Sequence, residues 1–242
     1  MSDVSELFYK VNGKTIEGYL NDINRNPFIL FVLREPNSGG YDKPSNEFWM
    51  KRVIDPRNNV SRSGKYLRTL GTLAAKLKGE EINSGVDYTH KFKELLNECA
   101  YINIYPFSGS GKAGVHYYKT ETALFDVQKG GASFFSDSPL TVADKENYDA
   151  IAKNRLQIIK DIQCKYVVTV CGAYEAIVQT ADAGKLPKGI HIDGKDFRIT
   201  THLGKPILSY YHPGARHIQH ETMNIDRVSD YYIFHCEAKD DQ

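Results

Sequence analysis

The stretch Phe28-Ile29-Leu30-Phe31-Val32-Leu33 decides the fold class, because it is short, apolar throughout and soon followed by Pro36. A continuous apolar run of this length is typical of a parallel strand that is covered on both faces. Three other segments share the pattern, and we expect all four to form the central sheet. The predicted strands are Phe28–Leu33, Ala100–Tyr105, Tyr166–Cys171 and Ile207–Tyr211.

Helical periodicity fills most intervals between these strands. The predicted helices are Tyr66–Lys78, Tyr88–Cys99, Asp144–Gln163 and Gly172–Ala183. Strands that alternate with helices indicate parallel pairing through right-handed crossovers. We therefore expect an α/β fold with three layers, α/β/α, around a central, mostly parallel, four-stranded sheet. A hairpin is predicted over His191–Phe197 from its Asp-Gly turn signal, and residues 1–242 are expected to form a single domain.

The bulk composition argues against several classes of protein. The 242 residues carry a formal net charge of +1, which does not indicate a polybasic partner. No apolar run approaches the roughly 18–20 residues that span a bilayer, so we expect a cytoplasmic monomer without a membrane partner. The cysteines form no C-x-x-C pair, and we expect reduced, buried thiols and no metal site. They are Cys99, Cys164, Cys171 and Cys236.

Two of the predicted strands are followed by an ionisable residue and then by a proline. Glu35-Pro36 follows the first strand and His212-Pro213 follows the last. The carboxyl ends of parallel strands line the ligand crevice of an open sheet. A carboxylate and an imidazole at that edge can serve as a general base and as an electrostatic partner for a leaving group that departs as an anion.

Asn103 is a polar residue inside the apolar strand Ala100–Tyr105. A buried amide must find hydrogen-bond partners, and its donors and acceptor suit the edge of a nucleobase. The alternative is a structural amide that holds a neighbouring loop.

The order of these motifs resembles that of the uracil-DNA glycosylase superfamily. Leu33–Asn37 is similar to its first motif, which reads GQDPY, GINPG or GMNPG in different branches. Asn103 resembles the strand asparagine that reads the target base. The remaining blocks are Val167–Ala173, similar to the third-strand segment, and Tyr211–Arg216, similar to the second motif, HPSxx.

The resemblance implies a monofunctional DNA glycosylase that hydrolyses the N-glycosidic bond of a flipped base and leaves an abasic site. Glu35 would position water and stabilise the positive sugar, and His212 would stabilise charge on the departing base. Asn103, Pro36 and Asn37 would bind the base. The partner would be duplex or single-stranded DNA, and no cofactor is needed because a carboxylate and water suffice for such hydrolysis.

Several positions depart from the family pattern. Leu33 replaces the first-motif glycine, Glu35 replaces Asp or Asn, and Asn37 replaces the residue after the proline. Gly214 stands in place of the second-motif serine, and the cysteines of the iron–sulfur branches are missing. We expect the pocket to suit uracil or a modified pyrimidine, such as a bulky modified cytosine of phage DNA. Base-excision repair and antiviral defence both remain open as roles.

A basic segment, Lys51–Lys78, holds eight Lys and Arg residues and one acid. Such a segment could grip phosphates, and a solvated helix face is the alternative. The residues that we expect to contact the DNA backbone are Arg57, Arg62, Lys65 and Arg216.

Phe48 and Trp49 are adjacent aromatic residues that could stack on a flipped base. Packing in the core is the alternative for such a pair.

Two other functions stay open at the level of the sequence. The chain could be a non-catalytic nucleic-acid-binding protein of the same fold, although such a protein has no need for a carboxylate at Glu35. It could also be a glycosidase of free nucleosides or nucleotides, which would not require the basic segment.

Overall fold

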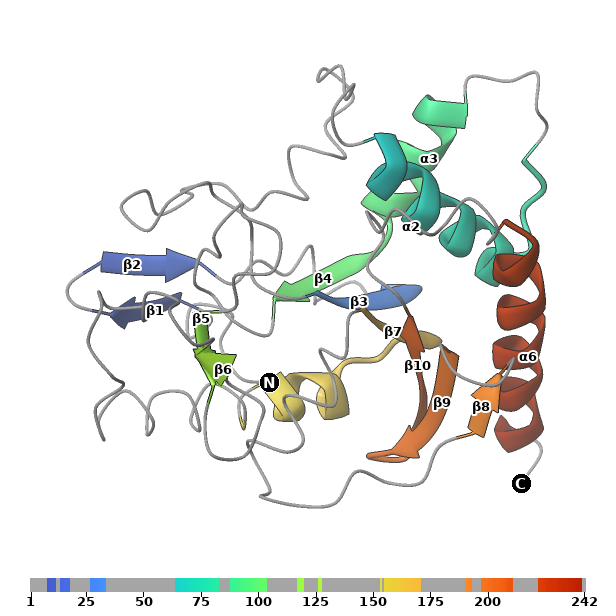
Figure 1. The fold of residues 1–242 in the computed structure, drawn as a ribbon. Coiled ribbons are helices and arrows are strands. Elements are labelled where there is room, and N and C mark those ends of the chain that lie inside the picture. Colours follow the sequence, from blue (N-terminus) through green and yellow to red (C-terminus); the bar gives the residue numbers. More distant parts are fainter. Residues whose placement is uncertain are drawn as a thin grey trace.

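The structure is a computed structural model, shown in Figure 1. It describes residues 8–11, 14–17, 27–33, 64–82, 88–103, 117–119, 126–127, 153, 155–170, 190–192, 197–210 and 222–240.

A six-stranded sheet forms the centre of the part of the chain that the structure describes. Its first four strands run parallel, and the last two pair antiparallel to them and to each other. Two separate two-stranded ribbons are also present, β1 (Phe8–Val11) with β2 (Lys14–Glu17) and β5 (Tyr117–Lys119) with β6 (Asp126–Val127). In spatial order the sheet consists of β4 (Ala100–Asn103), β3 (Ile29–Leu33), β7 (Tyr166–Val170), β10 (Lys205–Tyr210), β9 (Phe197–His202) and β8 (Ile190–Ile192).

The prediction of a mixed α/β fold with a mostly parallel sheet is confirmed, whereas the prediction of four strands is wrong. The four predicted strands are β3, β4, β7 and β10, and they are the parallel ones. The two additional strands, β8 and β9, extend the sheet on the β10 side. They include the predicted hairpin, because Ile192 pairs with Phe197 across its turn.

The turn between β9 and β10 explains how the second hairpin forms. His202 pairs with Lys205, so only two residues make the turn. Both have positive φ, 54° at Leu203 and 78° at Gly204. Two consecutive residues of positive φ are the geometry of a type I′ turn, which matches the twist of antiparallel strands.

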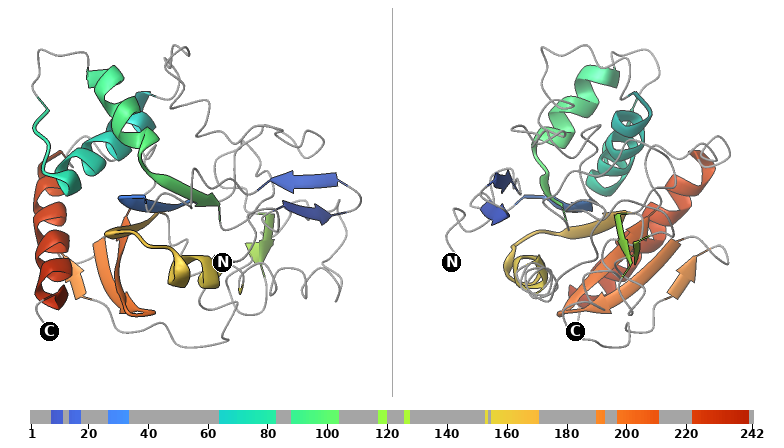
Figure 2. Two further views of the ribbon diagram at one scale, coloured as in Figure 1. Left: turned by 180° about the vertical axis from the view of Figure 1, so that it is seen from behind. Right: turned by 60° about the vertical axis from the view of Figure 1, so that its left-hand side comes forward.

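Helices α2 (Gly64–Lys78), α3 (Tyr88–Asn97) and α6 (Thr222–Asp240) cover one face of the sheet (Figure 2). Alternate residues of the strands, such as Phe31 and Val168, pack against these helices in a continuous apolar core. Phe31 also stacks on Tyr101, with 5.6 Å between the ring centroids. We call this side of the sheet the apolar face.

Helix α2 contacts α3 closely and ends in a defined cap. A Cβ atom on Gly71 would lie 2.4 Å from Cγ of Phe92, so the two helices approach at a position where only glycine fits. The N–H of Glu80 donates to the carbonyl of Ala75, and that of Gly79 donates to the carbonyl of Lys76. With φ of 71° at Gly79, these bonds form a Schellman motif.

Helix α6 is fastened to the sheet by Tyr232, which is fully buried. Its hydroxyl accepts a hydrogen bond from the N–H of Val167 at 2.9 Å. The same hydroxyl donates to the carbonyl oxygen of Val167 at 2.7 Å, and the carbonyl oxygen of Pro206, at 2.9 Å, is a second acceptor. One side chain therefore joins α6 to both β7 and β10.

The opposite face of the sheet is covered by helical residues 155–161, drawn in yellow in Figures 1 and 2. The Nζ of Lys205, the first residue of β10, donates to the carbonyl of Ile159 at 3.0 Å and also to that of Ile162. These bonds anchor the carboxyl end of the helix beside the amino end of β10. This side also buries apolar residues of the strands, among them Leu30, Val32, Val167 and Ile207. We call it the polar face only to mark the hydroxyl side chains and the buried arginine described below.

The predicted helices are confirmed where the structure describes them. Tyr66–Lys78 and Tyr88–Cys99 correspond to α2 and α3 within two residues at each end. The predicted helix Asp144–Gln163 is helical at residues 153 and 155–161, and it ends earlier than expected. Gly172–Ala183 lies outside the described residues. Helix α6 and the ribbons β1–β2 and β5–β6 were not predicted.

Candidate functional site

The carboxyl ends of the four parallel strands lie at the same level of the sheet. Asn103 pairs with Leu33 across β4 and β3. Val32 is level with Thr169, and Tyr210 is level with Val170. The register therefore aligns the last residues of β4, β3, β7 and β10, and β7 separates β3 from β10. The chain therefore leaves all four parallel strands at the same edge of the sheet.

Of the predicted site residues, one ends a strand at this edge, one lies in a helix, and the others lie outside the described residues. Asn103 is the last residue of β4 and Lys65 is the second residue of α2, although their side chains are not described. The predicted residues that lie outside the described part are Glu35, Pro36, Asn37, Phe48, Trp49, Arg57, Arg62, His212 and Arg216.

Two hydroxyl side chains lie on the polar face, one residue before the strand ends. Thr169 of β7 is fully buried and its hydroxyl donates to that of Ser209 on β10, at 3.3 Å. The two residues are Cα partners in the register of the sheet. The polar face therefore carries hydroxyl groups close to its carboxyl edge, where an apolar side chain would be expected in a sheet that is covered on both faces.

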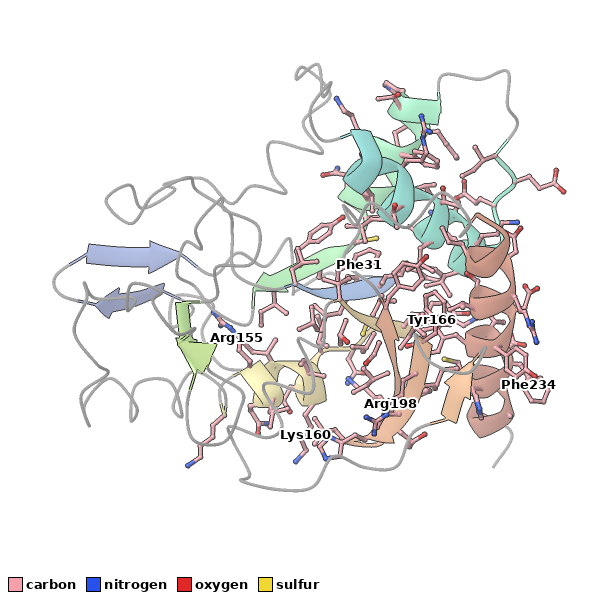
Figure 3. The ribbon with its side chains drawn as sticks, in the orientation of Figure 1. Phe31, Arg155, Lys160, Tyr166, Arg198 and Phe234 are labelled. Atoms are coloured by element: carbon pink, nitrogen blue, oxygen red, sulfur yellow. The ribbon has the colours of Figure 1, made fainter. Side chains whose placement is uncertain are left out.

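Arg155 is a functional candidate that the sequence reasoning missed. Its side chain has no exposed surface, and it is the largest of the fully buried side chains described. It lies on the helix that covers the polar face (Figure 3). The signal was present, because Ile158, Ile159 and Ile162 follow at helical spacing and place Arg155 at a position that an apolar residue would normally occupy.

The structure describes the carboxyl-terminal part of the basic segment, residues 64–78, and two of its last lysines are paired with acids. Lys76 contacts Asp226 of α6 at 2.7 Å. Lys78 contacts Glu98 at 2.5 Å and Glu80 at 3.2 Å, and the hydrogen bond to Glu98 raises the pKa of Lys78. The basic character that the sequence indicated is therefore reduced at Lys76 and Lys78. Any phosphate-binding surface in this segment must rely on residues that precede them.

The structure also describes three of the four cysteines and allows a search for metal sites and membrane-spanning helices. Cys99 and Cys236 are buried free thiols, as predicted, and Cys164 is a free, half-buried thiol. Within the described ranges, no group of three or more His, Cys, Asp or Glu residues could hold a metal ion. None of the helices that the structure describes is both long and apolar enough to cross a membrane.

Comparison with models of protein families found no match for this chain, and comparison with curated proteins found none either.

Proposed function

We propose that the chain is a monofunctional DNA glycosylase of the uracil-DNA glycosylase-like fold, with three α/β/α layers. One observation carries the proposal. The strand that precedes Glu35 and the strand that precedes His212 are parallel, end at the same level and are separated by one strand. The motifs that resemble the superfamily therefore follow strands of the order and direction that a shared site requires.

The spacing of the strands supports a site for one nucleotide between these residues. Adjacent strands are about 5 Å apart, so β3 and β10 lie about 10 Å from each other. Glu35 and His212 each follow a strand end by two residues, and chain connectivity keeps their Cα atoms within about 8 Å of that end. Two side chains that converge from such positions leave room for a sugar and its base.

The chemistry divides between the two residues. Glu35 positions the attacking water and stabilises the positive charge that develops on the sugar. His212 donates to the carbonyl oxygen of the departing base and stabilises its negative charge. Asn103, which ends β4 beside β3, reads the edge of the base through its amide. Water and a carboxylate suffice for this hydrolysis.

The decisive experiment tests cleavage directly. The protein is incubated with duplexes and single strands that carry uracil, deaminated purines, or hydroxymethylated and glucosylated cytosines, and alkali-labile abasic sites are measured. We expect cleavage at uracil or at a modified pyrimidine. Glu35→Gln and His212→Ala should each slow the single-turnover rate by about 10²- to 10⁴-fold, with little change in DNA binding.

Glu94→Gln provides a matched control, because Glu94 is an exposed carboxylate on α3. It should cleave at the parent rate. Binding of DNA without cleavage of any substrate would favour the non-catalytic rival. Hydrolysis of free nucleosides without cleavage of DNA would favour the second rival.

DNA binding can be tested through its salt dependence. We expect the combined substitutions Arg57→Ala, Arg62→Ala and Lys65→Ala to reduce the log–log salt slope by about one unit for each phosphate that the protein no longer binds. The matched control replaces Lys76 and Lys78, which are already paired with acids. The control should leave the slope unchanged. If the slope instead falls for the Lys76 and Lys78 variant and stays unchanged for the triple variant, the DNA binds on the surface near α6 and α3.

A further inference from the structure

A row of polar side chains crosses three neighbouring strands on the polar face. Thr169 of β7 is the Cα partner of Ser209 on β10, and Ser209 is in turn the Cα partner of Arg198 on β9. Partners in register lie on the same face of a sheet. The residues that flank Arg198, Phe197 and Ile199, belong to the apolar core, and Figure 3 shows Arg198 on the side of β9 away from α6. We call Thr169, Ser209 and Arg198 the polar row.

Solvent reaches the polar row although it lies inside the sheet. β10 is an interior strand, flanked by β7 and β9. Ile207 of β10, on the same face, has no exposed surface, whereas Ser209 and Arg198 are only half-buried. The helical residues 155–161 cover the face near the amino end of β10, where Lys205 binds them, and Ser209 lies about 13 Å farther along the strand. The side chains of the row are therefore accessible to a ligand near the carboxyl end of β10.

The hydrogen bond within the polar row makes it a set of donors. The hydroxyl of Thr169 donates to the oxygen of Ser209 at 3.3 Å, so the hydrogen of the Ser209 hydroxyl has to be donated to a different acceptor. The guanidinium of Arg198 has five N–H donors and no acceptor. Cross-strand partners hold their Cβ atoms about 5 Å apart, which is close enough for Ser209 and Arg198 to bind one group. A ligand that fits them has several acceptor oxygens.

The charges on the same face favour an anion. Lys205 and Arg198 are the charged side chains that the described strands place on the polar face, and both are cations. Lys205 donates to carbonyl oxygens, which leave its charge in place. The planar fork of a guanidinium fits two oxygens of a phosphate through parallel hydrogen bonds. Phosphate therefore has both the acceptor oxygens and the negative charge that suit the polar row.

The polar row lies next to the edge of the sheet that carries the proposed site. Thr169 and Ser209 each precede the last residue of their strand. His212 follows Ser209 by three residues, so chain connectivity keeps their Cα atoms within about 11 Å of each other. The backbone phosphates of a nucleotide whose base is held by His212 are therefore within reach of the row.

We propose that Arg198 and Ser209 bind one phosphate of the DNA strand that carries the flipped nucleotide, and that Thr169 orients the hydroxyl of Ser209. This inference rests on the proposed function and deepens it. The phosphate site holds the backbone from the β9 side, while Glu35 and His212 act on the sugar and the base. Arg198 belongs to a strand that extends the sheet beyond the four predicted ones, so this contact is separate from those of the basic segment.

Replacement of single phosphates by neutral groups tests the phosphate site without any need for cleavage. The probe is a duplex with a tetrahydrofuran abasic-site analogue, in which each phosphate near the analogue is replaced in turn by an uncharged methylphosphonate. We expect Arg198→Met to weaken binding of the all-phosphate duplex by about 10- to 100-fold and to lower the log–log salt slope by about one unit. On one methylphosphonate duplex it should weaken binding by less than about 3-fold, because the charge that Arg198 binds is already gone.

Three further variants support this measurement. Arg198→Lys keeps the charge and loses the fork, so it should keep the slope and lose part of the affinity. Arg227→Met is the matched control, since Arg227 is an exposed arginine on α6, across the sheet from the polar row, and it should change neither affinity nor slope. If Arg198→Met does not fold, Ser209→Ala takes its place. It should weaken binding of the all-phosphate duplex by about 3- to 10-fold, and that of one methylphosphonate duplex by less.

The outcomes separate the phosphate site from the proposed function. Unchanged affinity and slope for Arg198→Met, or the same loss on every methylphosphonate duplex, would overturn the inference. Competition by inorganic phosphate at constant ionic strength, without any methylphosphonate effect, would assign the site to a free anion and overturn its assignment to DNA. If the parent binds DNA through this phosphate but cleaves none of the substrates named above, the glycosylase proposal fails and the phosphate site remains.

Discussion

On the apolar face, β3 and β7 direct Phe31, Val168 and Val170 into a layer shared with α2, α3 and α6. On the polar face, one residue away along β7, the sheet presents the hydroxyl of Thr169, and the covering helix supplies a fully buried Arg155. The same strands therefore serve two different environments. The difference teaches that substitutions of the core side chains should change stability, whereas those of Thr169 and Arg155 are where activity and stability can be separated.

The largest expected effect comes from a cavity in the apolar face. Phe31→Ala removes a fully buried ring that stacks on Tyr101. We expect a loss of about 3–5 kcal/mol in the free energy of unfolding, measured by urea denaturation. Phe234→Ala, at a side chain of α6 that is 67% exposed, should change stability by no more than about 0.5 kcal/mol. Similar losses at both positions would contradict the assignment of the core.

A smaller effect is expected where α2 and α3 approach each other. Gly71→Ala would place a methyl group 2.4 Å from the ring of Phe92 and should destabilise the protein by about 1–3 kcal/mol. Gly79→Ala is the comparison, because nothing lies within 4 Å there and only its φ of 71° disfavours a side chain. That change should cost about 1 kcal/mol. A larger loss at Gly79 would mean that the two helices are farther apart.

Alkaline pH should act on stability through Cys164, which lies just before β7. Burial raises the pKa of this thiol from 9.0 to about 11, partly offset by the nearby charge of Lys205. The unfolded chain ionises its thiol first, so this contribution to stability is complete below pH 9 and is lost as the pH rises toward 11. We expect it to lower the free energy of unfolding by about 1 kcal/mol at pH 10.

The contribution of Cys164 can be isolated by substitution. Urea denaturation at pH 8 and pH 10 should show a smaller decrease for Cys164→Ala than for the parent. Tyr166 and Tyr232, whose pKa values are also raised by burial, contribute in the same direction in both proteins. Equal decreases would show that the thiol of Cys164 is in contact with water.

The smallest expected change in stability is at the paired hydroxyls. Thr169→Val keeps the shape of the side chain and removes its hydrogen bond to Ser209. We expect a loss of about 1 kcal/mol or less, well below that of Phe31→Ala. A loss as large as that at Phe31 would make the polar face as important to stability as the apolar one.

The elements that could be predicted from the sequence are those with an uninterrupted signal. Strands β3 and β7 are apolar at every position except Thr169 and were identified nearly to the residue. Helix α6 buries Ile225, Val228 and Tyr232 at helical spacing, but the exposed Tyr231 and Phe234 obscure that pattern. Tertiary packing decides which of its apolar residues face the core, and a sequence carries no direct record of that choice.

The turn at Leu203 and the charge at Arg155 show two other reasons for failure. Asn and Asp are the usual first residues of a type I′ turn, so Leu203 gave no signal for the hairpin of β9 and β10. Arg155 occupies a core position of its helix, which composition alone reads as a surface residue.

The candidate site could be predicted only as a set of strand ends. The sequence indicates that Glu35 and His212 follow strands, but it does not indicate which strands are neighbours. The structure shows that β7 lies between β3 and β10 and that their ends are level. Strand order depends on contacts between distant segments, and local patterns do not encode such contacts.

The pairing of β3 with β7 also has a consequence for synthesis of the chain. Ile29 and Tyr166 are partners from opposite halves of the sequence, so β3 leaves the ribosome long before the strand that flanks it. Every described residue of β3 is buried in the finished sheet. Until β7 and β10 are made, this apolar strand has an open edge, and such edges are sites of aggregation. The nascent chain should therefore need protection by chaperones, and its final folding step should await the second half of the molecule.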